Sequence, residues 1–220
     1  MSTSSPSVGS PRRRFTLAAL LTGVLGVVVL ALSMNSSLAA FTASITNSVN
    51  TAAAGTVIME EKNAAGTVTC LSTDGTGNNV ATNAATCATI NKYGGSTTMV
   101  PGQTVSTTVT IKNTGTAAAT SFTLAPGTCT QSGNVSGSAT DFCAKLGIVI
   151  TQTAGTTTST ITPASSSLTS LAAGGALTLA APVAAGATVS FTFAVTLAAS
   201  AGNTYQGLAA SQPLVWTFTA

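Results

Sequence analysis

The chain has 220 residues, of which seven are Lys or Arg, four are Asp or Glu and none is His, giving a formal net charge of +3 at pH 7. Charged residues make up 5% of the chain, far below the roughly 25% of ordinary soluble domains. The absence of His excludes Ser-His and Cys-His nucleophile pairs, HExxH zinc sites and most imidazole metal sites.

Residues 1–39 are expected to be a signal peptide. Arg12–Arg14 form a positive n-region, Phe15–Leu32 is an uncharged run, and Ser37-Leu38-Ala39 places small residues before a cleavage point after Ala39 or, as second choice, Ala40. The run is long enough to span a membrane, so retention as an N-terminal anchor stays an alternative. RRRFTL also resembles a twin-arginine export motif, although the Leu/Val-rich run fits general secretion better.

Removal of this segment changes the charge balance. Three of the seven basic residues lie in Arg12–Arg14, which leaves four Lys against four Asp and Glu. A nearly neutral chain without a basic patch gives no reason to expect nucleic-acid binding. A surface of Thr, Ser, Asn, Gly and Ala has little charge repulsion to keep strand edges apart, which favours ordered self-association. The alternative is that a neutral, Thr-rich composition is simply common in exported proteins encoded by high-GC genomes.

Residues 40–54 begin with an alternating segment that predicts a strand. The positions on one side of the extended chain are apolar, except that Asn47 interrupts the pattern. These positions are Phe41, Ala43, Ile45, Asn47 and Val49. The segment is either the first strand of the protein's own sheet or a donor strand that completes the sheet of a neighbouring molecule. Ala52–Gly55 is small and unpatterned, as in a linker.

Residues 55–220 are expected to form one domain, which starts with a hairpin. Gly55–Lys62 and Thr67–Leu71 are strand-like and flank a four-residue turn that contains Gly66. Residues 72–95 are rich in Gly, Asn, Thr and Ala without a sustained period, which indicates a long surface loop.

The four cysteines are predicted to form two disulfides. Cys70 and Cys87 bracket the long loop, and Cys129 and Cys143 bracket a second irregular stretch. Three pairings are possible; we choose neighbour with neighbour because each pair then spans one loop. A zinc site would need paired thiols at short spacing, which the chain lacks.

The remaining chain carries further alternating strands separated by turn residues. The clearest central-strand pattern is Val189–Leu197, in which five alternate positions are large and apolar. The other expected strands are Val100–Lys112, Ser121–Leu124, Leu146–Ile150, Leu177–Leu179, Tyr205–Leu208 and Leu214–Phe218. Only short helical turns are expected, near Leu168–Ala173 and Leu197–Ala201. This pattern predicts an all-β sandwich with a single core.

We expect no enzyme activity and no metal or other cofactor. Glu60 and Glu61 are adjacent, so in a strand they point to opposite faces and cannot form a facing acid/base pair. No phosphate-binding or dinucleotide-binding glycine pattern leads from a strand into a helix.

The sequence resembles the TasA/camelysin group of secreted Gram-positive proteins. The similarity is carried by AFTASITNSVNTAAAGTVIM at Ala40–Met59, by the apolar signal before it, and more loosely by SAGNTYQGLAASQPLVWTF at Ser200–Phe218. This resemblance implies export through a specialised signal peptidase, a jelly-roll-like sandwich, and an extracellular biofilm-matrix fibre. Camelysin-like members have been described as metallopeptidases, but the absence of His argues against that activity here.

In that family the mature N-terminal strand of one subunit inserts into the next. Carried onto this chain, the donor positions are Phe41, Ala43, Ile45, Asn47 and Val49, with Ala52–Gly55 as the connector. The expected partner is thus a second copy of the chain, joined head to tail. The alternative is a monomeric surface sandwich that acts as an adhesin or ligand-binding module, with the segment paired in its own sheet.

Overall fold

The computed structural model describes residues 21–28, 44–45, 50–74 and 83–220. The chain divides into two compact units, Met1–Ala52 and Ala53–Ala220.

In the first unit, residues 21–28 are helical, while Ser44 and Ile45 have no regular structure. No helix in the described ranges is both long and apolar enough to cross a membrane. The rest of the expected signal peptide lies outside the described residues. So do the expected donor positions Phe41, Ala43, Asn47 and Val49.

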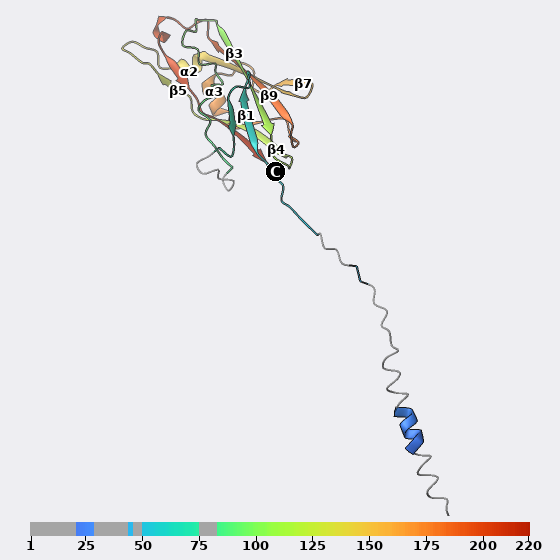
Figure 1. The fold of residues 1–220 in the computed structure, drawn as a ribbon. Coiled ribbons are helices and arrows are strands. Elements are labelled where there is room, and N and C mark those ends of the chain that lie inside the picture. The colour runs from blue at the N-terminus through green and yellow to red at the C-terminus, as the bar shows by residue number, and fades with distance from the viewer. Residues whose placement is uncertain (1–20, 29–43, 46–49, 75–82) are drawn as a thin grey trace, which may run out of the picture. The chain divides into compact units, whose positions relative to one another are not determined.

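The second unit is an all-β sandwich, as predicted (Figure 1). Its larger sheet is antiparallel, with six strands in the order β2-β1-β3-β9-β6-β7. These strands are β1 (Met59–Asn63), β2 (Thr69–Leu71), β3 (Thr104–Asn113), β6 (Leu146–Ala154), β7 (Thr157–Thr160) and β9 (Thr188–Leu197).

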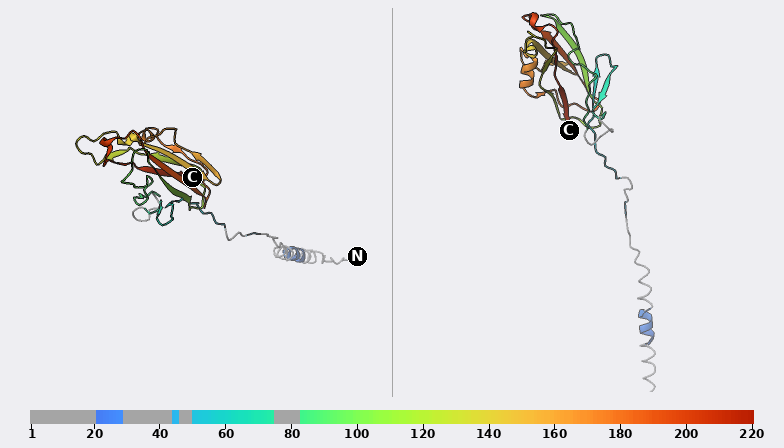
Figure 2. Two further views of the ribbon diagram at one scale, coloured as in Figure 1. Left: turned by 90° about the horizontal axis from the view of Figure 1, so that it is seen from above. Right: turned by 90° about the vertical axis from the view of Figure 1, so that its left-hand side faces the viewer.

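The smaller sheet has three strands in the order β11-β4-β8. They are β4 (Ser121–Pro126), β8 (Leu177–Thr178) and β11 (Leu214–Thr219). A separate two-stranded ribbon pairs β5 (Thr130–Ser132) with β10 (Ala209–Ser211). The helices of this unit are short: α2 (Phe142–Lys145), α3 (Leu168–Ala173) and the 3-10 turn η1 (Asn203–Tyr205). In the right-hand view of Figure 2 the β1–β2 hairpin and α3 lie on opposite sides of β11.

The core is built on β9, which lies between β3 and β6 as the alternation predicted. All five of its inward side chains are buried: Val189, Phe191, Phe193, Val195 and Leu197. Phe191 meets Phe122 of β4 edge to face, with ring centroids 5.6 Å apart, and Trp216 of β11 at 4.7 Å. Aromatic pairs therefore join the two sheets.

The opposite face of the larger sheet is polar and rich in hydroxyls. Thr108 of β3 and Thr192 of β9 bond through their hydroxyls at 3.1 Å, and Thr104 and Thr196 do so at 2.7 Å. Cross-strand Thr pairs of this kind stabilise a sheet. The Thr-rich composition therefore supplies the solvent face of the same strands whose other face forms the core.

Several expected strands have different boundaries in the structure. β3 begins at Thr104 rather than Val100, because residues 100–103 form a turn in which Gln103 N donates to Val100 O at 2.9 Å, and β6 continues beyond Ile150 to Ala154. β1 begins at Met59 rather than Gly55, because residues 56–58 bond to the turn after β3: Thr116 N donates to Thr56 O at 2.8 Å and Thr114 N donates to Ile58 O at 2.8 Å. The strand expected at Tyr205–Leu208 is wrong. Its start belongs to η1, Gly207 adopts a φ of +74°, and β10 begins only at Ala209.

We expect Phe191→Ala to lower the free energy of unfolding by about 3–5 kcal/mol, because it leaves a cavity between the two sheets. Its neighbour Ser190 points to the opposite, polar face, so Ser190→Ala should change stability by less than about 1 kcal/mol. Urea denaturation of the two variants measures both values. Equal losses would contradict the assignment of the two faces.

Candidate functional site

The candidate site is the free edge of β11. β11 pairs with β4 from Leu214↔Pro126 to Thr219↔Ser121, and no other described strand pairs with its second edge. Gly127 N donates to Pro213 O at 2.8 Å, so these two residues form a hydrogen-bonded pair in line with the β4–β11 ladder. In an antiparallel ladder every second residue along the strand then bonds to the partner strand. Residues 215, 217 and 219 therefore bond to β4, whereas the N–H and C=O groups of Leu214, Trp216 and Phe218 face the open edge.

The same three residues turn their side chains toward the core. Leu214, Trp216 and Phe218 are partly buried, whereas the alternate residues between them are exposed. The Trp216 ring lies 4.7 Å from the ring of Phe191 and 5.7 Å from that of Phe122, between centroids. One row of residues thus offers apolar side chains and unpaired backbone groups together, which are the two features a docking strand requires.

A groove of about 1300 Å³ lies along this edge. One wall is β11 with the β10–β11 connection, and the other is β1 with Val57, Met59 and Glu61. The larger sheet continues through β1 and β2, while the described part of the smaller sheet ends at β11. The groove lies where one more strand beside β11 would continue the smaller sheet.

Residues 83–99, which we call the strap, line the groove between its two walls. The contacts that hold the strap include the Cys70–Cys87 disulfide, the Lys92–Glu61 ion pair at 2.7 Å, and a hydrogen bond of 2.7 Å from Tyr93 Oη to Gln212 Oε1. Burial raises the pKa of the Tyr93 phenol, so this group stays protonated and keeps donating. The surface loop expected at residues 72–95 therefore also contributes to the interior, where Ile90 is buried.

The Lys92–Glu61 pair is the most buried ion pair among the described residues, with side chains 10% and 8% exposed. Glu61 faces inward from β1, whereas Glu60 faces outward and pairs with Lys62 at 3.0 Å. This arrangement confirms that the adjacent carboxylates point to opposite faces. Sequence reasoning missed the role of Lys92, because no periodic pattern in the strap signals an inward-facing residue.

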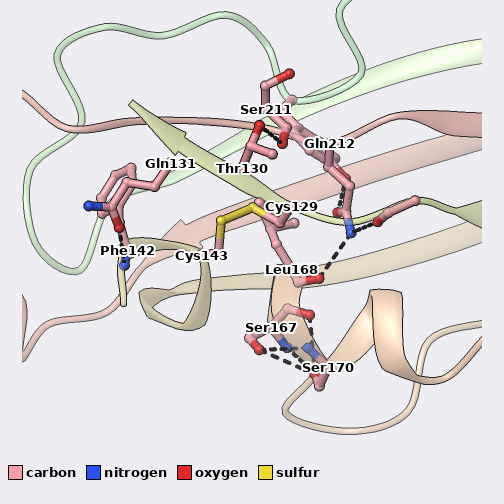
Figure 3. The surroundings of a disulfide bond; sticks show 12 residues. Cys129, Thr130, Gln131, Phe142, Cys143, Ser167, Leu168, Ser170, Ser211 and Gln212 are labelled. Atoms are coloured by element: carbon pink, nitrogen blue, oxygen red, sulfur yellow. Dashed lines mark hydrogen bonds between the residues drawn. A yellow bond between two sulfur atoms is a disulfide. The ribbon is translucent and has the colours of Figure 1, made fainter. Parts of the chain in front are cut away.

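The second disulfide, Cys129–Cys143, joins the residue before β5 to α2 (Figure 3). Both disulfides have the neighbour-with-neighbour pairing that was predicted. Gln131 Oε1 accepts a hydrogen bond from Phe142 N at 2.8 Å and orders the loop that this disulfide spans. Gln212 Nε2 donates to Gly127 O at 2.8 Å and to Leu168 O at 3.0 Å. Because its Oε1 also accepts from Tyr93, Gln212 joins the strap, the smaller sheet and α3.

Two buried polar atoms of groove-lining residues have no hydrogen-bond partner among the described residues. Trp216 Nε1 is buried, and no oxygen or nitrogen of the described residues accepts its hydrogen bond. Glu61 Oε1 is also buried without a hydrogen bond of acceptable geometry, although Lys92 Nζ lies 2.7 Å away as its ionic partner. A buried donor without an acceptor is energetically unfavourable.

The other carboxylates lie in separate local contacts. Asp141 accepts a hydrogen bond of 2.7 Å from Tyr205 Oη, which raises the pKa of that phenol, and Asp74 Oδ2 accepts one of 2.6 Å from Leu71 N. The structure does not bring two carboxylates together as an acid/base pair in the part it describes. Within the described ranges, no three His, Cys, Asp or Glu side chains are grouped to hold a metal ion.

Of the expected donor positions only Ile45 is described, and its side chain is 94% exposed. No protein-family model matches the chain, and no curated protein is significantly similar to it. The resemblance to the TasA/camelysin group therefore stays a prediction from the sequence.

We expect Lys92→Met to lower the free energy of unfolding by about 3–5 kcal/mol, because the Glu61 carboxylate is left buried without its ion partner. The control is Lys62→Met, which breaks the more exposed pair with Glu60 and should cost less than about 1 kcal/mol. Adding Glu61→Leu to Lys92→Met should restore most of the loss. Urea denaturation measures all three variants, and an equal effect in both single variants would contradict a buried pair.

Proposed function

We propose that this chain is an exported structural subunit that assembles head to tail. Residues 41–49 of one molecule add as a strand to the open edge of β11 in the next. The observation that carries the proposal is the row of Leu214, Trp216 and Phe218, which presents unpaired backbone groups beside an apolar groove. The TasA/camelysin resemblance supports the same kind of assembly.

The chemistry of the N-terminal segment matches this edge. Its apolar positions occur at every second residue, so they would all enter the groove while the polar positions face solvent. Backbone hydrogen bonds at about 1 kcal/mol each and burial of Phe41 and Ile45 at about 2 kcal/mol each oppose the cost of ordering the segment. This balance supports micromolar or tighter linkage.

The entry point of the chain favours exchange between molecules over insertion into the same molecule. Thr56 O accepts a hydrogen bond from Thr116 N, and Thr120 N donates to Thr219 O, so the start of the domain and the end of β11 meet at the same connection (Figure 1). If the segment paired with β11 of its own chain, the short connection through residues 50–55 would place the end of the segment beside the end of β11. The two strands would then run parallel. A segment from another molecule is free to pair antiparallel, which is the slightly more stable arrangement.

Exchange in one direction is a heterologous contact, which builds an open filament when it does not close into a ring. Export is supported by the sequence of residues 1–39 and by the two disulfides, which persist in oxidising compartments. The second candidate is a monomeric surface sandwich in which residues 41–49 occupy the groove of their own chain. Because Thr56 and Thr219 bond to the same connection, the segment of the same chain lies within reach of this edge, although with the less stable parallel pairing.

Protein that begins at Ala40 should form filaments, whereas protein that begins at Gly55 should stay monomeric, because only the first retains the donor segment. Among the residues that the structure describes, every buried core residue lies after Gly55, so both forms should fold. Electron microscopy and size-exclusion chromatography compare them. If both forms are monomeric at high concentration, the second candidate is favoured; if both form filaments, the donor-strand mechanism is wrong.

A synthetic peptide of residues 40–54 should bind the domain Gly55–Ala220, and N-methylation should reveal the direction of pairing. In an antiparallel pair, the residues opposite Leu214, Trp216 and Phe218 share their face and exchange both backbone bonds with them. Methylation at Ala43 and Ile45 should therefore abolish binding, whereas methylation at Ser44 and Thr46 should be tolerated. Fluorescence anisotropy measures the affinities. The reverse pattern would indicate parallel pairing, and tolerance of both would contradict strand addition.

A further inference from the structure

A second open edge lies at the end of the larger sheet that is remote from the groove. β7 is the last strand in the order β2-β1-β3-β9-β6-β7, whereas the strand that forms a wall of the groove is β1. All four residues of β7 are exposed, and no other described strand pairs with its second side. Figure 1 shows β7 at the margin of the domain, so both of its faces and one edge are open to solvent.

The hydrogen bonds of the β6–β7 hairpin show which backbone groups face this edge. Ile161 N donates to Ile150 O at 2.9 Å, so this pair is hydrogen-bonded and the pairs along the ladder alternate from it. Thr153 and Thr158 then form a non-hydrogen-bonded pair, which agrees with the 2.9 Å distance between their hydroxyls. The N–H and C=O groups of Thr158 and Thr160 therefore point away from β6.

The opposite end of the same sheet is protected, whereas β7 is not. At β2, Asp74 occupies both backbone groups of Leu71: its Oδ2 accepts from Leu71 N at 2.6 Å, and its N donates to Leu71 O at 3.0 Å. Cys70 of β2 is also joined to the strap by its disulfide. β7 has no charged residue, no Pro and no bulge in its register with β6. Since these are the usual devices that keep edge strands apart, β7 is open to another strand.

A second copy of β7 fits this edge because the strand is complementary to itself. In an antiparallel pair with a two-fold axis at Ser159, Thr158 of each copy lies opposite Thr160 of the other, and each such pair exchanges both backbone bonds. No charge on either strand opposes the approach. Threonine hydroxyls meet across this new ladder as they do between β3 and β9 of the same sheet.

We propose that β7 joins two copies of the chain through this antiparallel pairing, so that the larger sheet of one molecule continues into that of the next. The backbone bonds of one contact, with little apolar burial, do not offset the entropy lost when two separate molecules associate. The isolated domain is therefore monomeric at ordinary concentration. In a filament the contact repeats, and each contact that forms raises the effective concentration for the next. The pairing then joins filaments side by side, a consequence that rests on the proposed function.

Cysteine cross-linking tests the contact without any filament. The two copies of Ser159 face each other as a non-hydrogen-bonded pair, with Cα atoms about 4.5 Å apart, which a disulfide can bridge. The two copies of Thr157 lie roughly 13 Å apart along the strands, which is too far. In the concentrated domain Gly55–Ala220, Ser159→Cys should therefore form several-fold more disulfide-linked dimer than the control Thr157→Cys. Non-reducing electrophoresis measures the yields, and equal yields would overturn the pairing.

A proline substitution tests the effect on filaments of protein that begins at Ala40. Thr158→Pro removes an N–H that faces the open edge, so β7 keeps its bonds to β6 but loses part of the new pairing. The control Thr158→Val loses the same hydroxyl and keeps the N–H. Unchanged protein and Thr158→Val should form bundles in electron microscopy, whereas Thr158→Pro should form single filaments. Thermal unfolding shows whether both variants are folded.

The outcomes separate this proposal from strand addition at β11. Equal bundling in all three proteins would overturn the role of β7, and so would single filaments of the unchanged protein. Absence of any filament would contradict the proposed function, and the cross-linking yields would still decide whether β7 pairs with itself. If Thr158→Pro does not fold, the comparison of Ser159→Cys with Thr157→Cys decides the proposal.

Discussion

The two sheets of the domain differ in their number of strands, and the open edge that results governs the rest of the structure. The larger sheet runs through six strands, while the smaller one has three and ends at β11 with one edge unpaired. Proteins usually cover, charge or interrupt such an edge because it is a template for pairing. The segment Leu214–Thr219 carries no charged residue and no Pro, so within the strand itself neither device is used.

The domain has few charged side chains, and two pairs of them form ion pairs on β1. Glu61 and Lys92 connect β1 to the strap in a buried pair, while Glu60 and Lys62 form a more exposed pair on the opposite face of the same strand. A buried pair adds little net stability over well-packed apolar residues, but removal of one partner is costly. The Glu61–Lys92 pair therefore specifies where the strap lies, together with the Cys70–Cys87 disulfide and the Tyr93–Gln212 hydrogen bond.

Several elements were predictable because their signals are local. The alternation in Val189–Leu197 identified β9 as the central strand, and the turn around Gly66 identified the β1–β2 hairpin. The disulfide pairing followed from loop bracketing. The β5–β10 ribbon was missed because Thr130–Ser132 and Ala209–Ser211 are three residues each, too short to show a period. The strap was read only as a loop, since Ile90, Lys92 and Tyr93 are held inside by residues distant in the sequence.

The sequence by itself determined the all-β class, the core faces of the long strands and the adjacent-cysteine disulfides, because each follows from periodicity or spacing within a short stretch. It also marked the alternating segment at 41–49 and the polar interruption at Asn47. Only the tertiary structure decided which strand keeps a free edge, that a groove runs beside it, and that the Trp216 indole N–H is buried without an acceptor among the described residues. These features depend on strand order and on contacts between distant segments, and neither is encoded in the pattern of a single strand.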